Sequence, residues 1–300
     1  MEKTLTVFTP AYNRAHTLPR TYQSLCRQTC KDFEWLIVDD GSSDNTRELV
    51  EGWIKENIIP IRYIYQDNQG MHGAHNTAYL NITTELNTCI DSDDYMPDDA
   101  VEKIISFWKE KGSDKYAGII GLDYSISGEL IGTKFPDDLT ETALLDFYRN
   151  GGKGDKKLVY RTDIIKKYPP YPLFPGEHYV GLTYLYMLID QDYKLLTINE
   201  PLVCVDYQLE GSSINMYKQY INNPRGFAFL RREYMKYAKG FFEKYKTCIH
   251  YVSSSIMIKN TNLLRESPLK VLTALAIMPG LFLFLYIHLM VFRNNKMKIN

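Results

Sequence analysis

The stretch Thr88-Cys89-Ile90-Asp91-Ser92-Asp93-Asp94 is the part of this sequence that decides its fold. An apolar run ends there and three carboxylates follow at once, which indicates a buried strand that delivers acids to the carboxyl edge of a sheet. Ligands of open α/β sheets bind at this edge. Three acids so close together repel one another unless a cation shares them, and oxygen-rich sites of this kind suit Mg²⁺ or Mn²⁺.

A simpler interpretation covers part of this acidic stretch. Pro97, Asp98 and Asp99 favour the start of a helix, because proline fits the first helical turn and acids are favourable at a helix N-terminus. This interpretation explains Asp98 and Asp99. Asp91 and Asp93 precede the predicted helix and need another reason.

Size and composition limit the classes of protein to consider. The chain has 300 residues, 45% of them hydrophobic, and a net charge of −1, which suits one large domain or two small ones. Near-neutral charge argues against a general nucleic-acid binder. The five cysteines form no CxxC pair and are odd in number, so we expect no disulfide framework and no structural zinc site. Residues 5–8 are too short for the apolar core of a signal peptide, so the catalytic part is expected in the cytosol.

Short apolar runs and amphipathic stretches alternate along the first 110 or so residues. Strands are predicted at residues 5–8, 33–38, 61–65 and in the run that ends at Asp91, with a helix after each. Pro10 is expected to stop the first strand. This alternation predicts an α/β fold with a mostly parallel sheet flanked by helices and right-handed crossovers. A parallel sheet places Asp39 and Asp40, which end the second strand, on the same edge as Asp91.

Two phosphate-binding motifs are missing from the sequence. No GxGxxG follows the first predicted strand, and GxxxxGK[ST] does not occur. A dinucleotide oxidoreductase and a P-loop NTPase therefore lose their expected phosphate cradles. What remains is a nucleotide whose diphosphate is held by a metal ion on carboxylates.

Three motifs in order resemble those of family 2 glycosyltransferases of the GT-A fold. They are Thr9-Pro10-Ala11-Tyr12-Asn13-Arg14, Ile37-Val38-Asp39-Asp40-Gly41-Ser42-Ser43-Asp44 and Asp91-Ser92-Asp93-Asp94. The resemblance is strong over about residues 3–125 and looser to about residue 215. It implies a Rossmann-like GT-A catalytic domain over residues 1–215, with a nucleotide-sugar half (about 1–125) and an acceptor half (about 126–215).

The resemblance also implies a set of nucleotide-sugar-binding residues. They are Thr9, Pro10, Tyr12, Asn13, Asp40, Asn68, His75, Asp91 and Ser92. Asp40 would accept the imide N–H of the base, usually uracil, although a turn or capping role also explains this acid. Tyr12 would line the base and ribose pocket, with simple packing as the alternative. His75 would donate to ribose or phosphate, and a structural histidine is the competing interpretation.

The family's Asp-x-Asp metal motif is matched by Asp91-Ser92-Asp93. The resemblance implies that Asp93 coordinates Mn²⁺ or Mg²⁺ directly and that Asp91 contacts the ribose or metal-bound water, or the ion itself. Asp94 would support the site from behind. In this family the metal bridges the diphosphate and stabilises the leaving group.

Family members of this type invert the configuration of the sugar, and a carboxylate accepts the proton of the acceptor hydroxyl. Glu177 is the predicted base, and Asp155 is the second candidate. A surface glutamate beside a Pro-Gly turn is the bland alternative for Glu177. Gly181-Leu182 stands where close relatives carry an acid. Gly211-Ser212-Ser213 resembles a family loop that closes near the nucleotide.

Three basic residues of the acceptor half are ambiguous. Lys156, Lys157 and Arg161 could face the acceptor or the diphosphate, but solvated surface charges explain them equally well.

The last third of the chain changes in composition. Residues 216–265 interleave basic and aromatic side chains, which fits a helical region at an anionic membrane surface or a helical cap on the catalytic domain. Residues 266–300 form a predicted membrane-associating segment, because residues 271–292 contain no Asp, Glu, Lys or Arg. A single span and a hairpin bent at Pro279-Gly280 in one leaflet remain open, as does a buried or oligomer-forming helix.

The expected function is that of an inverting, metal-dependent glycosyltransferase in cell-surface polysaccharide synthesis. It would move a sugar from a nucleotide-sugar, such as a UDP-sugar, to a saccharide or lipid-linked saccharide at the cytoplasmic face of the membrane. No nucleic-acid partner is expected, and the oligomeric state is left open. The alternatives are a nucleotidyltransferase acting on sugar phosphates and an inactive membrane-anchored GT-A scaffold.

Overall fold

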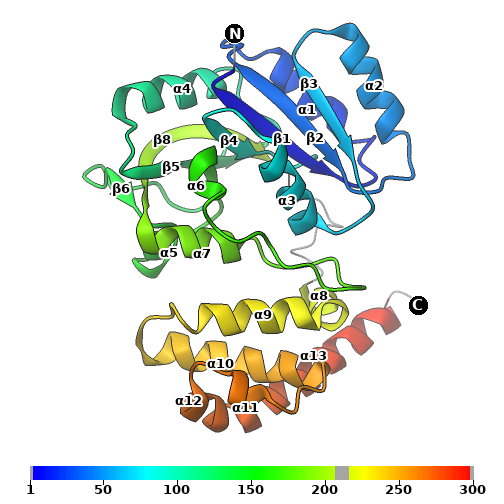
Figure 1. The fold of residues 1–300 in the computed structure, drawn as a ribbon, viewed down its shortest axis with the longest axis vertical. Helices are drawn as coiled ribbons and strands as arrows, with labels where there is room; N and C mark the ends of the chain where they lie inside the picture. The colour runs from blue at the N-terminus through cyan, green and yellow to red at the C-terminus, as the bar shows by residue number, and fades with distance from the viewer. Residues whose placement is uncertain (1–2, 207–215, 298–300) are drawn as a thin grey trace. The chain divides into compact units, whose positions relative to one another are not determined.

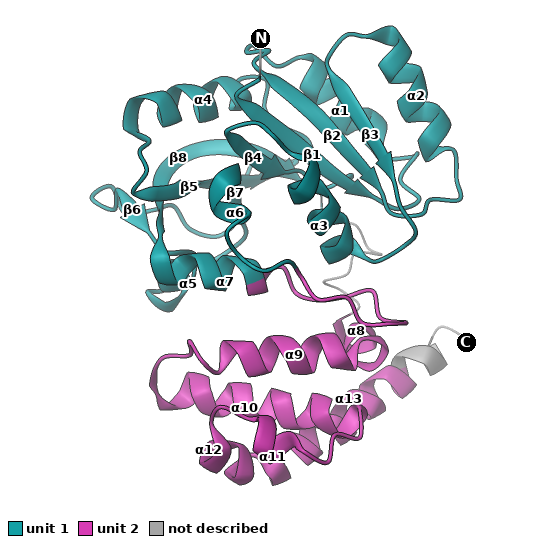
Figure 2. Cartoon of the chain, in the orientation of Figure 1, with its two compact units in different colours: residues 1–170, 185–208 teal, residues 171–184, 209–300 magenta. Residues whose placement is uncertain are grey.

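The chain divides into two compact units (Figures 1 and 2). The computed structural model describes residues 3–206 and 216–297. Unit 1 comprises Met1–Pro170 and Leu185–Gln208, and unit 2 comprises Tyr171–Tyr184 and Leu209–Asn300. The predicted loop at residues 211–213 and the predicted boundary at residue 215 lie outside the described residues. The five cysteines are free thiols.

Unit 1 contains the sheet and the helices that flank it. The strands are β1 (Leu5–Ala11), β2 (Phe33–Asp39), β3 (Ile61–Tyr65), β4 (Leu86–Cys89), β5 (Tyr116–Ser125), β6 (Glu141–Thr142), β7 (Lys156–Arg161) and β8 (Lys194–Val205). The helices are α1 (Leu18–Cys26), α2 (Thr46–Glu56), α3 (Met71–Asn81), α4 (Ala100–Lys111), α5 (Leu144–Arg149), α6 (Thr162–Ile165) and α7 (Thr183–Asp192), whose first two residues belong to unit 2.

The strands form one eight-stranded sheet in the order β3-β2-β1-β4-β7-β5-β8-β6 (Figure 1). The four strands from β3 to β4 are parallel, and β5 is parallel to β8. β7 runs antiparallel to both of its neighbours, β4 and β5. The prediction of a mostly parallel sheet is therefore confirmed. Because β7 is reversed, its first residues lie at the edge where β4 and β5 end.

The core of unit 1 forms around central strands that are covered on both faces. All seven residues of β1 are buried, and so are six of the seven in β2, which is typical of strands sandwiched between helices. On one face the rings of Tyr22, Trp35 and Trp53 stack, with 4.3 Å between the centroids of Tyr22 and Trp53. This packing anchors α1 and α2 to β2 and so positions the loops that follow β1 and β2.

Pro10 does not stop β1, contrary to the prediction. β1 continues through Pro10, which pairs with Val38, and ends at Ala11. The ladder between β1 and β4 ends at the pair Phe8–Cys89. Beyond Phe8 the strand has a partner on one side only, so a residue without an N–H donor is tolerated there.

Unit 2 is helical, as predicted for the C-terminal region. Its helices are α8 (Met216–Asn222), α9 (Pro224–Tyr234), α10 (Gly240–Met257), α11 (Leu263–Glu266), α12 (Lys270–Leu275) and α13 (Ile277–Met297). A small core forms around α10, where Cys248, Tyr251 and Val252 pack with Met235, which directly follows α9, and with Ala276.

The apolar segment 271–292 is interrupted, but not at Pro279-Gly280 as the leaflet-hairpin alternative supposed. The break between α12 and α13 is at Ala276, whose N–H donates to the carbonyls of Leu272 and Thr273. Pro279 lies in the first turn of α13, where a missing N–H costs nothing. A Cβ on Gly280 would lie 2.5 Å from Cγ1 of Val252, so this glycine permits α13 to cross close to α10. Within the described residues, no helix is both long enough and apolar enough to cross a membrane.

Candidate active site

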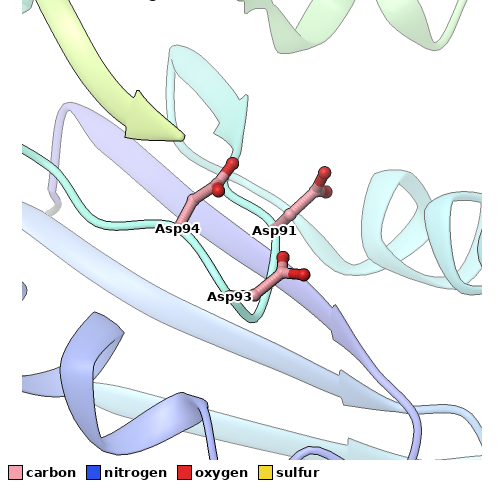
Figure 3. A group of neighbouring side chains, drawn as sticks. All are labelled: Asp91, Asp93 and Asp94. Carbon is pink, nitrogen blue, oxygen red and sulfur yellow. The ribbon is translucent and has the colours of Figure 1, made fainter. Parts of the chain in front are cut away.

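Three carboxylates gather on the turn after β4 (Figure 3). One oxygen from each of Asp91, Asp93 and Asp94 lies within 4.8 Å of the other two. The turn is closed by the N–H of Asp94, which donates to the carbonyl of Asp91 at 3.1 Å. Hard divalent cations prefer oxygen ligands of this kind. These residues therefore fit the predicted metal site, and the donor set does not select between Mg²⁺ and Mn²⁺.

The electrostatics of the cluster also favour a cation. Burial, followed by the charge of Asp91, raises the pKa of Asp94 to about 7. Asp91 is reached by solvent, yet the dense protein around its carboxylate raises its pKa, and the ammonium of Lys157 opposes that shift. Neighbouring carboxylates repel one another when all are ionised, and a bound cation reduces this repulsion.

Asp94 and its neighbours hold the turn in place, and the support that Asp94 would give to a bound metal ion stays a prediction. Its Oδ1 accepts the N–H of Asp206 at 3.0 Å, and its carbonyl accepts the hydroxyl of Thr21 at 2.7 Å. Arg20 donates to the carbonyl of Asp93 and also to Asp206 at 2.7 Å. Ser92 is buried in this turn. The turn is thus clamped by α1 and by the residue that follows β8.

Two lysines at the start of β7 have different surroundings. Nζ of Lys157 donates to the carbonyl of Cys89 at 2.7 Å, directly before the acidic turn. Burial lowers the pKa of Lys157, but the negative charges around it, led by Asp123, raise it overall, so the side chain stays a cation. Lys156 instead donates to the carbonyls of Ile131, Lys153 and Asp155 and organises that loop. Lys157 therefore belongs to the site.

Arg161, the third ambiguous cation of the sequence, lies at the far end of β7. Its guanidinium pairs with Asp114 and Asp163 at 3.2 and 2.8 Å. It is therefore placed at the opposite edge of the sheet from the acidic turn.

Asp123, near the end of β5, is a site residue that the sequence reasoning missed. It is 4% exposed, and its Oδ1 has no hydrogen-bond partner among the described residues. Burial raises its pKa to about 6, Lys157 opposes the shift and Asp155 adds to it. A single acid directly after the apolar run 117–122 was the available signal, since an acid in a buried strand needs a partner or a function.

The nucleotide pocket is expected at the ends of β1, β2 and β3. Asp40 is buried and accepts hydrogen bonds from the side chain of Gln66 and from the N–H groups of Gln69 and Gly70, at 2.6 to 2.9 Å. Gly41, with φ of +86°, approaches Asn68 so closely that a Cβ would lie 3.0 Å from its backbone nitrogen. Asp40 and Asn68 therefore meet in one loop cluster. A base bound there would share the oxygens of Asp40 with this loop.

Other predicted nucleotide contacts have distinct environments. Tyr12 is 50% exposed and is available for stacking. Asn13 adopts φ of +54°, and its Oδ1 accepts the N–H groups of Ser43 and Asp44, so it shapes the loop. Thr9 is buried and its hydroxyl accepts the indole N–H of Trp35 at 2.9 Å, which commits this side chain to the core.

His75 lies in α3 in a fully buried position. Its ring meets Phe8 edge-to-face at 5.0 Å between centroids, and Nδ1 lies 3.1 Å from the hydroxyl of Tyr79. Burial lowers the pKa of His75 to about 3, so the imidazole is neutral at physiological pH. The structure does not bring this ring to the solvent-accessible part of the site.

Glu177, the predicted base, belongs to unit 2. Its carboxylate caps α9: Oε1 accepts the N–H and Nε of Arg225 at 3.0 and 2.9 Å, and Oε2 accepts the N–H of Gly226 at 2.9 Å. These contacts give Glu177 a structural role. Asp155, the second candidate, lies in unit 1 directly before β7.

The fold and the acidic turn are those of a glycosyltransferase, and comparison with known proteins identifies the family. Residues 6–168 match the family described as Glycosyl transferase family 2. This match covers more than half of the chain, and the chain therefore belongs to glycosyl transferase family 2.

Characterised relatives agree with this assignment. The chain is 29% identical over 216 residues to the UDP-Glc:alpha-D-GlcNAc-diphosphoundecaprenol beta-1,3-glucosyltransferase WfgD of Escherichia coli, covering 71% of this chain and 80% of WfgD. It is 36% identical over 100 residues to the glycosyltransferase GlyA of Streptococcus pneumoniae, of which that match spans only 14%.

Solved structures share the fold. TarS 1-349 of S. aureus in complex with UDP-GlcNAc has a TM-score of 0.59 at 18% identity, over 94% of this chain and 81% of that one. The mannosyltransferase PcManGT from Pyrobaculum calidifontis, in complex with GDP-Man and Mn²⁺, has a TM-score of 0.57 at 14% identity, over 95% and 88%. At these identities the likeness establishes the GT-A fold alone.

Proposed function

We propose that this glycosyltransferase transfers a sugar with inversion from a UDP-sugar to a saccharide or lipid-linked saccharide in cell-surface polysaccharide synthesis, with Mn²⁺ or Mg²⁺ as cofactor. The observation that carries this proposal is the three-carboxylate turn after β4, on the sheet edge where Asp40 also lies. The names of two relatives support it, since WfgD uses UDP-Glc and a diphosphoundecaprenol-linked GlcNAc, and TarS has been crystallised with UDP-GlcNAc.

The candidate site residues of unit 1 each have a defined part in the proposed reaction. Asp40 accepts the imide N–H of the base, Tyr12 covers the base, and Asn68 lines the pocket beside Asp40. Asp93 and Asp91 hold the cation, which neutralises the diphosphate of the leaving nucleotide when it is bound. The ammonium of Lys157 adds fixed positive charge behind the acidic turn. The donor is thereby oriented with its diphosphate at β4 and its base at β2.

A nucleotide titration and a donor screen test this proposal. UDP should bind much more tightly with Mn²⁺ than with EDTA, because Asp91 and Asp93 would hold the cation and its positive charge would attract the diphosphate. Release of UDP from UDP-glucose, UDP-galactose and UDP-N-acetylglucosamine, with GDP-mannose as the contrasting donor, should single out one UDP-sugar. The assignment would be refuted if the UDP affinity were the same with Mn²⁺ and with EDTA and no donor were turned over.

We further propose that unit 2 docks on the cytoplasmic face of an anionic membrane. Six apolar residues of α12 and α13 recur at alternating intervals of four and three, and each is between 47% and 75% exposed. They are Val271, Leu275, Met278, Phe282, Leu285 and Leu289. The opposite side of the same helices, including Thr273, Ala276 and Gly280, is buried against α10. The six side chains of the stripe are therefore largely open to solvent.

The surroundings of this stripe favour lipid over a second protein helix. A coiled-coil seam is flanked by charged residues, whereas residues 271–292 carry none. The charges come at the two ends, with exposed Lys270 and Arg293. Apolar surface bordered by cations is attracted to anionic lipid head groups. An enzyme held on that surface would meet lipid-linked acceptors directly.

Vesicle co-sedimentation tests the membrane proposal. The protein should bind phosphatidylglycerol vesicles, and Phe282→Glu should weaken binding by at least about tenfold, because burying a phenylalanine is worth roughly 1.5–3 kcal/mol. Leu80→Glu is the matched control, since Leu80 is 80% exposed in α3 of unit 1. The opposing result is a wild-type protein that does not bind vesicles and is dimeric by light scattering, with a Phe282→Glu variant that is monomeric. That result would identify the stripe as a contact between two copies.

A further inference from the structure

Asp123 occupies a position in β5 that its own contacts do not explain. Its main-chain carbonyl accepts the N–H of Ile131, but Oδ1 of its buried carboxylate has no hydrogen-bond partner among the described residues. Burial of a carboxylate without full hydrogen bonding costs stability. A buried carboxylate with an oxygen that has no hydrogen-bond partner is a candidate for contact with a ligand or substrate.

The sheet register places Asp123 beside the acidic turn. Leu122 pairs with Lys156 of β7, so the next residue, Asp123, is level with Asp155. On the other side of β7, Thr88 pairs with Val159, and extending that register by three residues brings Asp91 level with Lys156. Asp91 and Asp123 are thus separated by one intervening strand.

This separation suits a sugar held between a metal-bound diphosphate and a second carboxylate. Two strand spacings amount to about 10 Å between backbones. Asp91 and Asp93 lie on one side of this gap and Asp123 on the other. A single sugar ring bound there would have its diphosphate at the acidic turn and its anomeric carbon toward Asp123.

The charged and titratable groups around Asp123 come from several elements. They are Lys156, Lys157 and Asp155 of β7 and its preceding loop, Asp91 after β4, Cys204 of β8 and Tyr148 of α5. Lys157 lowers the pKa of Asp123 more than Lys156 does, and its Nζ donates to the carbonyl of Cys89. Lys157 therefore offsets only part of the cost of burying the Asp123 carboxylate, and Oδ1 has no hydrogen-bond partner among the described residues.

We propose that Asp123 is the carboxylate that accepts the proton of the attacking acceptor hydroxyl, an inference that rests on the proposed function. As the hydroxyl oxygen forms its bond to the anomeric carbon, its proton passes to Oδ1 of Asp123. The bond from the anomeric carbon to the diphosphate oxygen breaks, and the nucleoside diphosphate leaves with the electron pair. The protonated Asp123 then returns its proton to water.

Two observations agree with this role. Asp123 is in unit 1 with the acidic turn, so its distance from the metal ligands is set by the sheet itself. The pKa of Asp123 is raised to about 6 by burial, which leaves the group ionised at neutral pH and close to the range that favours a general base. The carboxylate of Glu177, in contrast, accepts three hydrogen bonds from the start of α9.

The test compares Asp123→Asn with Asp155→Asn, using UDP-glucose, a GlcNAc-diphospholipid acceptor and Mn²⁺. If wild type does not turn over UDP-glucose, the donor selected by the screen replaces it. Asp123→Asn should lower kcat by about 100-fold or more, the contribution typical of a general base. The Kd for UDP with Mn²⁺ should stay within about threefold of the wild-type value, because UDP does not contact Asp123. Asp114→Asn, an exposed acid two residues before the same strand, is the matched control and should retain wild-type turnover.

The pH profile and the melting temperature separate this role from a structural one. In wild type, kcat should rise with pH through about 6 and then level off, and Asp123→Asn should lose this acid limb. The Tm of Asp123→Asn should be equal to or higher than that of wild type, and Asp123→Ser replaces it if the amide does not fold. Loss of kcat in Asp155→Asn with normal kcat in Asp123→Asn would overturn the proposal.

Two further outcomes would also overturn it. An Asp123→Asn variant whose donor KM rises while kcat is unchanged would make Asp123 a sugar-binding residue and not the base. An Asp123→Asn variant that keeps more than about a tenth of wild-type kcat at every pH has not lost its proton acceptor. Both results require an active wild-type enzyme, so they are distinguishable from failure of the proposed function, in which wild type itself turns over no nucleotide-sugar.

Discussion

Replacement of Glu177 should destabilise unit 2, because this carboxylate caps the start of α9. The first N–H groups of a helix have no partner within the helix, and Glu177 accepts those of Arg225 and Gly226 at 3.0 and 2.9 Å. It also pairs with Nε of Arg225 at 2.9 Å. A Cβ on Gly226 would lie 2.1 Å from the carbonyl of Tyr179, so the segment that carries Glu177 packs tightly on the helix.

The size of the effect follows from these contacts. Hydrogen bonds to a charged group contribute about 1.5–3 kcal/mol each, and loss of a helix cap costs about 0.5–2 kcal/mol. The Arg225 side chain is 41% exposed and regains water when the partner is removed, which discounts the ion pair. We therefore expect Glu177→Ala to lower the free energy of unfolding by about 2–4 kcal/mol, and Glu177→Gln by about half as much because one acceptor oxygen remains.

Thermal unfolding and hydrogen exchange together measure this effect. A loss of 2–4 kcal/mol should lower the Tm of unit 2 by roughly 8–32 °C, and the amides of Arg225 and Gly226 should exchange faster. Glu110→Ala is the control, because the Glu110 side chain is 68% exposed and its loss should cost less than about 0.5 kcal/mol. If Glu177→Gln leaves Tm and amide exchange unchanged while glycosyl transfer falls more than about 100-fold, the capping argument is wrong and Glu177 acts in the chemistry.

Two further predictions concern unit 1. Asp93→Asn should abolish the Mn²⁺-dependent part of UDP binding in calorimetry, whereas Asp98→Asn, which changes an exposed acid before α4, should not; equal Mn²⁺ dependence in both variants would remove Asp93 from the metal site. His75 is neutral when folded because its pKa is lowered to about 3, so protonation of the unfolded chain below about pH 6.5 destabilises the fold by up to about 1.4 kcal/mol per pH unit. His75→Gln should reduce this acid sensitivity in urea unfolding between pH 6.5 and 4, the exposed His16→Gln should not, and identical slopes for all three proteins would contradict the burial of His75.

The parts of the fold with local signals were predictable from the sequence. β3 has the predicted bounds, Ile61–Tyr65, because a short apolar run between turn residues leaves little choice. The helix predicted after Gly70 is α3, and the acidic turn follows β4 as expected. Each of these features depends on neighbours in the chain. Pro10 was misjudged because its tolerance depends on where a different strand, β4, ends.

Features that depend on distant pairing were not predictable in this way. The reversed strand β7 inserts between β4 and β5, and only this insertion makes Lys157 a site residue and Arg161 a remote one. Asp123 has no recognisable motif, because its significance comes from burial and from Lys157 across the sheet. Glu177 has the right residue type for a base, but its contacts with α9 are invisible in the sequence.

The acidic edge of the sheet also predicts that a bound cation stabilises unit 1. Folding raises the pKa of Asp94 to about 7, mainly through burial, so the folded state holds a proton that the unfolded chain releases near pH 4. Stability is therefore lost as pH rises from about 4 to about 7, on the order of 4 kcal/mol for Asp94, and Asp123 adds to this loss. A cation that binds only the folded state restores about 2.7 kcal/mol at one hundred times its Kd. This edge is thus a part of unit 1 whose charges the fold alone does not neutralise, which is the condition expected of a site for a metal-bound diphosphate.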